Sequence, residues 1–190
     1  MKPETSFSGR HILVALSGGI ACYKTATIVS RLVQGGAQVT VLMTEAATRF
    51  VGPLTFESLS GRAVLTSQWE QVESHDSQHI ALARAAHLML IAPASANTIA
   101  KLAGGFCDNI VTTIALALPP KTPLLLAPAM NAAMWENAIT QRNIQTLRDL
   151  RGVDLVGPEE GWQACRTKGM GRMSEPEAIV AAIEKLLARG

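Results

Sequence analysis

The segment HILVALSGGIA, residues 11–21, decides the fold of this chain. Its first six residues, His11–Leu16, form a continuous apolar run that predicts a buried strand. The small residues Ser17–Gly19 follow directly, and a helical pattern then extends from Gly19 to the glycine pair Gly35-Gly36, which is a C-cap signal. The chain is therefore expected to begin with a buried strand that passes through a glycine turn into a helix.

The same alternation of short apolar runs and longer helical patterns continues downstream. Further strands are predicted at Gln38–Met43, His87–Ala92, Pro123–Ala127 and Val153–Val156, and helices at Gly52–Gly61, His79–Ala86, Asn97–Ala103, Asp108–Leu118 and Asn131–Leu150. Continuous apolar strands separated by helices indicate a parallel sheet that is covered on both faces. We therefore predict an α/β fold with a single Rossmann-like (flavodoxin-like) doubly wound parallel sheet and helices on both faces.

Three segments lie outside this alternation. Residues 1–9 are polar and predict a flexible tail, which leaves one domain over residues 10–190. The irregular stretch Gly157–Met173 contains Gly161, Gly169 and Gly171, which predict a mobile flap. Its length indicates a functional segment, because long loops in compact domains are commonly functional. A capping box over Ser174–Glu177, with Pro176 in the first turn, predicts the start of the last helix.

Composition excludes several function classes. Of the 190 residues, 48% are hydrophobic and 17% are charged, which excludes a disordered chain. The chain has seventeen basic and fifteen acidic residues, which gives a net charge of +2. This balance excludes a protein that binds nucleic acid through bulk positive charge. It does not exclude binding of a small acidic ligand. The apolar runs are too short to span a bilayer, and no signal peptide is recognisable. We expect a cytoplasmic protein without a nucleic-acid or membrane partner.

The three cysteines, Cys22, Cys107 and Cys165, have no metal-ligand spacing, so no metal site is expected. Cys22 and Cys107 lie in largely apolar helical patterns and are interpreted as small core residues. Cys165 lies on the predicted flap beside Arg166 and near Lys168. Positive charge nearby lowers the pKa of a thiol, which makes Cys165 a usable proton donor.

Ligands of parallel sheets bind outside the carboxyl ends of the strands, so the residues that follow each strand are the candidate site. Small and polar residues stand there: Ser17-Gly18-Gly19-Ile20-Ala21, Thr44, Pro93–Thr98 (PASANT) and Pro128–Trp135 (PAMNAAMW). Helix N-termini at such positions can bind a phosphate. On its own, each motif also fits a tight turn or an N-cap, and capping is the favoured interpretation of Thr44 alone. The dinucleotide fingerprint G-x-G-x-x-G is not met.

Taken in order, the motifs resemble those of the homo-oligomeric flavin-containing cysteine decarboxylases. The resemblance covers about Arg10 to Leu187 and rests on Ser17–Ala21, the helix-opening His79, PASANT, PAMNAAMW, and Ala164-Cys165 followed by Gly169-Met170-Gly171-Arg172. It implies FMN as the cofactor and a homotrimer, in some members a dodecamer, with FMN at the subunit interface. One departure is visible, because Arg166 stands where the family commonly has glycine.

The resemblance also implies roles for individual residues. The implied FMN-binding residues are Ser17, Gly18, Gly19, Ile20, Thr44, Ser95, Ala96, Asn97, Thr98 and Met130. The implied catalytic residues are His79, Asn131 and Cys165, and the implied substrate-binding residues are Asn131, Ala164, Met173 and Arg84. In these roles His79 assists thiol deprotonation or orients the carboxylate region, Asn131 holds the carboxylate, and Cys165 donates a proton.

The implied activity is the FMN-dependent decarboxylation of 4′-phosphopantothenoylcysteine to 4′-phosphopantetheine in coenzyme A biosynthesis, through a thioaldehyde and an enethiolate. An oxidative peptidyl-cysteine decarboxylase is an alternative, although enzymes of that kind are not expected to share the full flap motif from Ala164-Cys165 to Met173. A flavin prenyltransferase has the same fold and FMN site but lacks the combination of PAMNAAMW and the cysteine flap. A non-catalytic regulatory FMN-binding protein is the third alternative.

Overall fold

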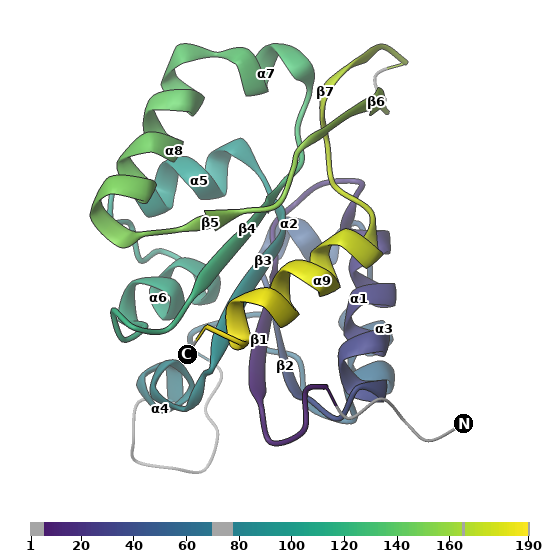
Figure 1. Cartoon of the computed structure of the whole chain (residues 1–190), viewed down its shortest axis with the longest axis vertical. Helices are drawn as coiled ribbons and strands as arrows, with labels where there is room; N and C mark the ends of the chain where they lie inside the picture. The colour runs from purple at the N-terminus through teal and green to yellow at the C-terminus, as the bar shows by residue number, and fades with distance from the viewer. Residues whose placement is uncertain (1–5, 70–77, 165, 190) are drawn as a thin grey trace.

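A computed structural model describes residues 6–69, 78–164 and 166–189 (Figure 1). Within these residues, five parallel strands form one sheet in the order β2-β1-β3-β4-β5. They are β1 (His11–Leu16), β2 (Gln38–Met43), β3 (Leu88–Ala94), β4 (Leu124–Pro128) and β5 (Asp154–Leu155). This is the flavodoxin-like order, in which the chain reverses its direction of growth between β1 and β3. The predicted fold class is confirmed.

Helices cover both faces of the sheet (Figure 1). One face carries α1 (Cys22–Gln34), α3 (Pro53–Ser60) and α9 (Pro176–Leu187), and the other carries α4 (Gln78–Ala85), α5 (Ala96–Ala103), α6 (Ile110–Ala117) and α8 (Ala138–Arg151). Within β1, Ile12 and Val14 belong to the first core, whereas Leu13 and Ala15 belong to the second. Successive strand residues point to opposite faces, so a strand buried on both faces is an uninterrupted apolar run.

The predicted helix over Asn131–Leu150 is wrong as a single element. The structure has a short helix α7 (Ala132–Glu136) and then α8, and the two are separated at Asn137, whose ψ of 129° is extended. The Asn137 side chain accepts a hydrogen bond of 2.9 Å from the Ile139 amide and so caps α8. An asparagine that bonds to the backbone in this way starts a new helix instead of continuing the old one.

The prediction of an irregular segment over Gly157–Met173 is also wrong. Strands β6 (Glu159–Trp162) and β7 (Lys168–Arg172) pair as an antiparallel hairpin, which stands beside α7 at one end of the molecule (Figure 1). The predicted capping box fails as well. The N-cap of α9 is Glu175, with no side-chain cap hydrogen bond among the described residues, and Ser174 is buried beside it.

Two smaller expectations concern residues near the surface. Cys22 is buried as expected, but Cys107 is exposed, so its assignment to the core is wrong. In the region predicted as a tail, Phe7 is buried, and its amide donates a 3.0 Å hydrogen bond to the Gly35 carbonyl at the end of α1. Among the described residues, none of the helices combines the length and apolarity that crossing a bilayer requires.

A buried histidine at the start of the sheet gives the first prediction, which concerns stability against pH. His11 Nε2 lies 2.9 Å from Thr40 Oγ1, and burial, followed by the charges of Arg62 and His87, lowers the pKa of His11 below its ordinary 6.5. The folded state therefore binds this proton less readily than the unfolded state does. The contribution of His11 is fully present above pH 6.5 and is lost as the pH falls through the lower, folded pKa.

We expect the urea midpoint to fall between pH 7 and pH 5, and we expect His11→Gln to make that fall shallower because it removes the titrating group. Urea unfolding of both proteins at the two pH values measures this. An equal fall of the urea midpoint between pH 7 and pH 5 in the two proteins would show that His11 does not cause the fall.

Candidate active site

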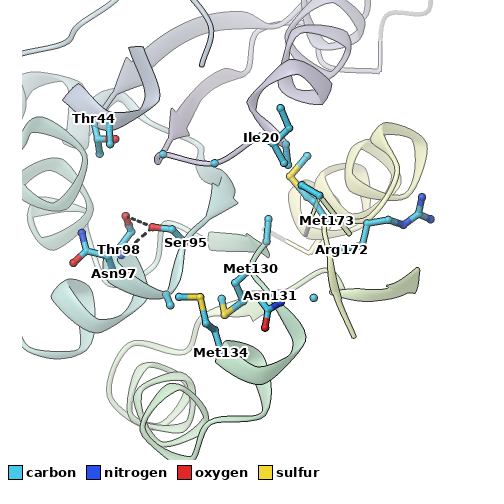
Figure 2. A pocket seen from close by; sticks show the side chains of 18 of the residues that line it. Ile20, Thr44, Ser95, Asn97, Thr98, Met130, Asn131, Met134, Arg172 and Met173 are labelled. Atoms are coloured by element: carbon cyan, nitrogen blue, oxygen red, sulfur yellow. Dashed lines mark hydrogen bonds between the residues drawn. The ribbon is translucent and has the colours of Figure 1, made fainter. Parts of the chain in front are cut away.

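A cavity of about 1210 Å³ opens at the carboxyl ends of the strands (Figure 2). Its walls come from four strand-to-helix turns, which follow β1, β2, β3 and β4, and from the hairpin β6–β7. Pockets for one small ligand commonly measure roughly 300–1,000 Å³. The cavity is therefore large enough to hold a cofactor and a substrate side by side.

The cavity brings together most of the residues singled out from the sequence. Those that line it are Gly18, Gly19, Ile20, Thr44, Ser95, Ala96, Asn97, Thr98, Met130, Asn131, Ala164 and Met173. They come from segments up to about 150 residues apart in the chain, which the parallel sheet collects at one edge.

The glycine turn after β1 forms the first wall. A Cβ on Gly18 would lie 2.6 Å from Ala46 Cβ in α2 (Glu45–Thr48), so only glycine allows this approach of the two turns. Ser17 lies beneath the wall and does not line the cavity: its Oγ donates to the Pro93 carbonyl at 2.7 Å and accepts from the Ser95 amide at 2.8 Å. Ser17 thus fixes the turn after β1 to the turn after β3.

Hydroxyl groups at two helix starts form the second wall. Ser95 Oγ accepts a 3.3 Å hydrogen bond from the Thr98 amide and lies 3.2 Å from Thr98 Oγ1, and Thr44 Oγ1 accepts one of 3.3 Å from the Ala47 amide. The capping interpretation of Ser95 and Thr44 is therefore confirmed. Both residues also line the cavity, so a cap and a ligand contact are compatible here.

The turn after β4 forms the third wall, with Met130, Asn131 and Met134 facing the cavity (Figure 2). Asn131 Oδ1 accepts a 2.9 Å hydrogen bond from the Ala133 amide and caps α7. Because the amide oxygen accepts the capping hydrogen bond of α7, the Nδ2 group is the end of the Asn131 side chain that can donate hydrogen bonds. Its distance to Gln163 Oε1 is 3.5 Å.

The hairpin forms the fourth wall. A Cβ on Gly171 would overlap the carbonyl oxygen of Met130, and the Met130 amide donates a 2.9 Å hydrogen bond to the Gly171 carbonyl. Close backbone contact therefore fixes β7 against the turn after β4. Cys165 lies outside the described residues, but its chain neighbours Ala164 and Arg166 both line the cavity.

Charged residues also line the cavity, namely Lys24, Glu45, Lys101, Asp108, Arg166 and Arg172. The sequence analysis named the two arginines as part of the flap but missed the other four. Lys24 Nζ forms an ion pair of 3.0 Å with Glu175 Oε1, and Arg172 pairs with the same carboxylate at 3.0 Å. No run of charge marks these residues in the sequence, because they meet only in the fold. The excess of cations suits an anionic ligand.

Two predicted site residues, His79 and Arg84, lie on α4. The cavity formed by the described residues of one chain includes neither of them. Helix α4 lies at the opposite end of the molecule from the hairpin (Figure 1). A single copy therefore does not bring His79 to Asn131.

Comparison with known proteins places the chain in a family. Residues 1–188 match the Flavoprotein family. A probable phosphopantothenoylcysteine decarboxylase of Streptococcus mutans is 46% identical over 178 residues, which cover 94% of this chain and 99% of that protein. The coenzyme A biosynthesis bifunctional protein CoaBC of Haemophilus influenzae is 44% identical over 96% of this chain. This chain spans only 45% of the length of that bifunctional relative.

Solved structures agree with this placement. A cysteine-to-serine mutant of PPC decarboxylase, complexed with pantothenoylaminoethenethiol, has a TM-score of 0.83 and 33% identity over 95% of this chain and 99% of its own. The FMN binding protein AtHal3 has a TM-score of 0.81 and 33% identity over 95% of this chain and 98% of its own. The family match over nearly the whole chain and the full-length relative lead to one conclusion: the chain belongs to the flavoprotein family.

Proposed function

We propose that this chain is an FMN-dependent phosphopantothenoylcysteine decarboxylase, which converts 4′-phosphopantothenoylcysteine to 4′-phosphopantetheine and CO₂ in coenzyme A biosynthesis. The observation that carries the proposal is Asn131, whose amide nitrogen is the donor end in a cavity shared by PASANT, PAMNAAMW and the hairpin. The extent of the match to the Streptococcus mutans relative supports it. Release of labelled CO₂ from carboxyl-labelled substrate tests it.

The residues of the cavity fit FMN. The glycine turn Gly18-Gly19 before α1 lines the cavity without side chains, which lets a phosphate approach its backbone closely. The hydroxyl groups of Ser95 and Thr98 and the amide of Asn97 suit a polyol chain and the polar edge of a ring, and Ile20 and Met130 suit its apolar face. FMN, when bound, supplies the acceptance and return of a hydride, which makes carboxylate loss from a cysteine derivative feasible.

The chain itself binds the substrate and handles its protons. Asn131 holds the carboxylate through neutral N–H donors, which position the group without over-stabilising the charge that must leave. The cationic lining attracts the phosphate of the substrate. His79 assists deprotonation of the thiol, and Cys165 donates a proton when the double bond is reduced. General acid and base catalysis of this kind is worth roughly 10²–10⁴-fold.

Replacing Cys165 by serine is expected to change the product rather than to stop CO₂ release, because the serine hydroxyl is a much weaker acid than a thiol. With FMN bound as the hydride acceptor, the substrate would still lose CO₂, and up to about one equivalent of enethiol per FMN would then remain. Support comes from the cysteine-to-serine mutant of the relative, which is complexed with an aminoethenethiol. Mass spectrometry of the variant's product measures the outcome. Turnover by Cys165→Ser all the way to the reduced thiol would remove Cys165 as the proton donor.

The proposal includes a homotrimer, or a dodecamer of trimers, in the cytoplasm, with FMN at the subunit interface. Exposed apolar side chains at the cavity support such an interface: Ile20 is 60% exposed, Tyr23 is 61% exposed and Trp162 is 69% exposed. The position of His79 on α4, outside the cavity of its own chain, supports it as well. A neighbouring subunit would then supply His79 to the Asn131 cavity.

Complementation between two impaired variants tests this arrangement. We expect His79→Asn and Asn131→Ala each to retain only a small, measurable fraction of the wild-type activity when expressed alone. If the residues of one site come from two subunits, every head-to-tail trimer that contains both variants has one restored site in three, so the doubly purified trimers regain about a third of the wild-type activity. Co-expression with two different affinity tags, followed by assay of the doubly purified protein, measures this. Co-assembled protein with no more activity than the single variants would contradict the shared site.

A further inference from the structure

We propose that Gln163 is a positioning residue, whose side-chain amide joins Asn131 and the hairpin β6–β7 into one rigid junction. Gln163 follows β6 directly and is 7% exposed. Its effect on turnover rests on the proposed function, because it would act through Asn131. The junction itself is a property of the fold and can be measured without substrate.

The two ends of the Gln163 amide bind different segments. Oε1 accepts a 3.2 Å hydrogen bond from the Ala132 amide at the start of α7, and it lies 3.5 Å from Asn131 Nδ2. Nε2 donates to the Met170 carbonyl at 2.9 Å and approaches the Gly169 carbonyl at 3.4 Å, both on β7. One side chain therefore connects the turn after β4 with both strands of the hairpin.

These contacts fix the orientation of the Asn131 amide. The Ala133 amide fixes the Oδ1 end, and Gln163 Oε1 accepts from the Nδ2 end. An amide held at both ends cannot exchange its donor and acceptor faces without breaking both hydrogen bonds. Gln163 thus selects the orientation in which Asn131 presents N–H groups, which is the orientation that a carboxylate requires.

A second, adjacent contact makes the junction rigid. The Met130 amide donates to the Gly171 carbonyl at 2.9 Å, and a Cβ added at Gly171 would lie 2.9 Å from Gln163 Nε2. The backbone of Gly171 therefore packs closely against both the Met130 backbone and the Gln163 side chain. In Figure 2, Met130 and Asn131 are labelled on the turn after β4, and Arg172 is labelled on the hairpin. The turn after β4 and the hairpin are expected to move as one body.

A double-mutant cycle tests the catalytic part. Gln163→Met keeps the length of the side chain and removes both polar ends. We expect it to lower kcat about tenfold in the Asn131 background and by less than about twofold in the Asn131→Ala background, because contacting residues that act together are not additive. FMN affinity stays unchanged, which shows that the variant is folded. Gln145→Leu, on the exposed side of α8, is the matched control and leaves kcat unchanged.

Amide hydrogen exchange tests the junction without substrate. We expect Gln163→Met to speed exchange at Ala132 and also at Met130, whose own partner is Gly171. Gln163→Glu is a second variant: it keeps an acceptor for Ala132 but places a carboxylate oxygen against the Met170 carbonyl, so it also speeds exchange at Met130.

The outcomes separate the two proposals. If the wild-type protein releases no CO₂, the proposed function fails. The exchange rates at Ala132 and Met130 still show whether Gln163 holds the junction together. Unchanged exchange at Met130 in both variants overturns the junction. Fully additive effects of Gln163→Met and Asn131→Ala on kcat overturn the positioning role.

Discussion

Asn131→Asp is expected to lower kcat/KM by about 10²–10³-fold, because it replaces N–H donors with a negative charge that faces the substrate carboxylate. The substitution retains the shape of the side chain and the acceptor that caps α7, since Oδ1 binds the Ala133 amide at 2.9 Å. Aspartate is as good an N-cap as asparagine, so the fold is expected to survive. Steady-state kinetics together with FMN titration measure the loss and show that it lies in substrate turnover.

Asn137 provides a matched control for this experiment. Its Oδ1 caps α8 by accepting from the Ile139 amide, also at 2.9 Å, but Asn137 does not line the cavity formed by the described residues. Asn137→Asp should therefore leave kcat/KM within about twofold of the wild-type value, as expected for a surface substitution. Equal losses in the two variants would mean that the Asn131 effect arises from helix capping and not from substrate binding.

Gly171→Ala is expected to lower turnover by at least about 10²-fold while FMN stays bound, since a displacement of about 1 Å at a site can have that effect. The φ of Gly171 is 135°, which an alanine rarely adopts, and its Cβ would overlap the Met130 carbonyl. Either β7 leaves the turn after β4 or that turn moves. Of the residues proposed to bind FMN, only Met130 lies at this contact, and those in the turns after β1, β2 and β3 do not.

The matched control is Gly52→Ala, at the start of α3. Gly52 has an ordinary φ of −68°, and no described atom lies within 4 Å of an added Cβ. Kinetics, FMN titration and thermal unfolding of both variants measure the contrast. Wild-type turnover in Gly171→Ala would show that close docking of the hairpin is not required for the reaction.

The strands could be predicted from the sequence because each buried strand is visible as a local run of apolar residues. The bounds of β1 and β2 agree with the prediction to the residue, since strands buried on both faces are uninterrupted apolar runs that end at polar or glycine residues. The strand-end motifs then located the cavity, because a parallel sheet gathers its carboxyl ends at one edge.

A local side-chain cap and several tertiary contacts decide the features that the sequence analysis missed. The break at Asn137 depends on a side chain that caps α8, and the hairpin depends on contact between Gly171 and Met130. Gln163 was missed because it lies in no motif with a recognised chemistry and gains its role only where β6, β7 and α7 meet. The sequence singled out His79, but a single chain does not bring it to the cavity.

The mass of the product formed anaerobically from 4′-phosphopantothenoylcysteine by the FMN-loaded protein tests the central claim most directly. The account predicts the loss of CO₂ alone, because the hydride removed from the substrate is returned to it and Cys165 supplies the proton. Loss of CO₂ together with two hydrogens would contradict it and would indicate an oxidative cysteine decarboxylase. Unchanged substrate in the presence of bound FMN would contradict the decarboxylase activity itself.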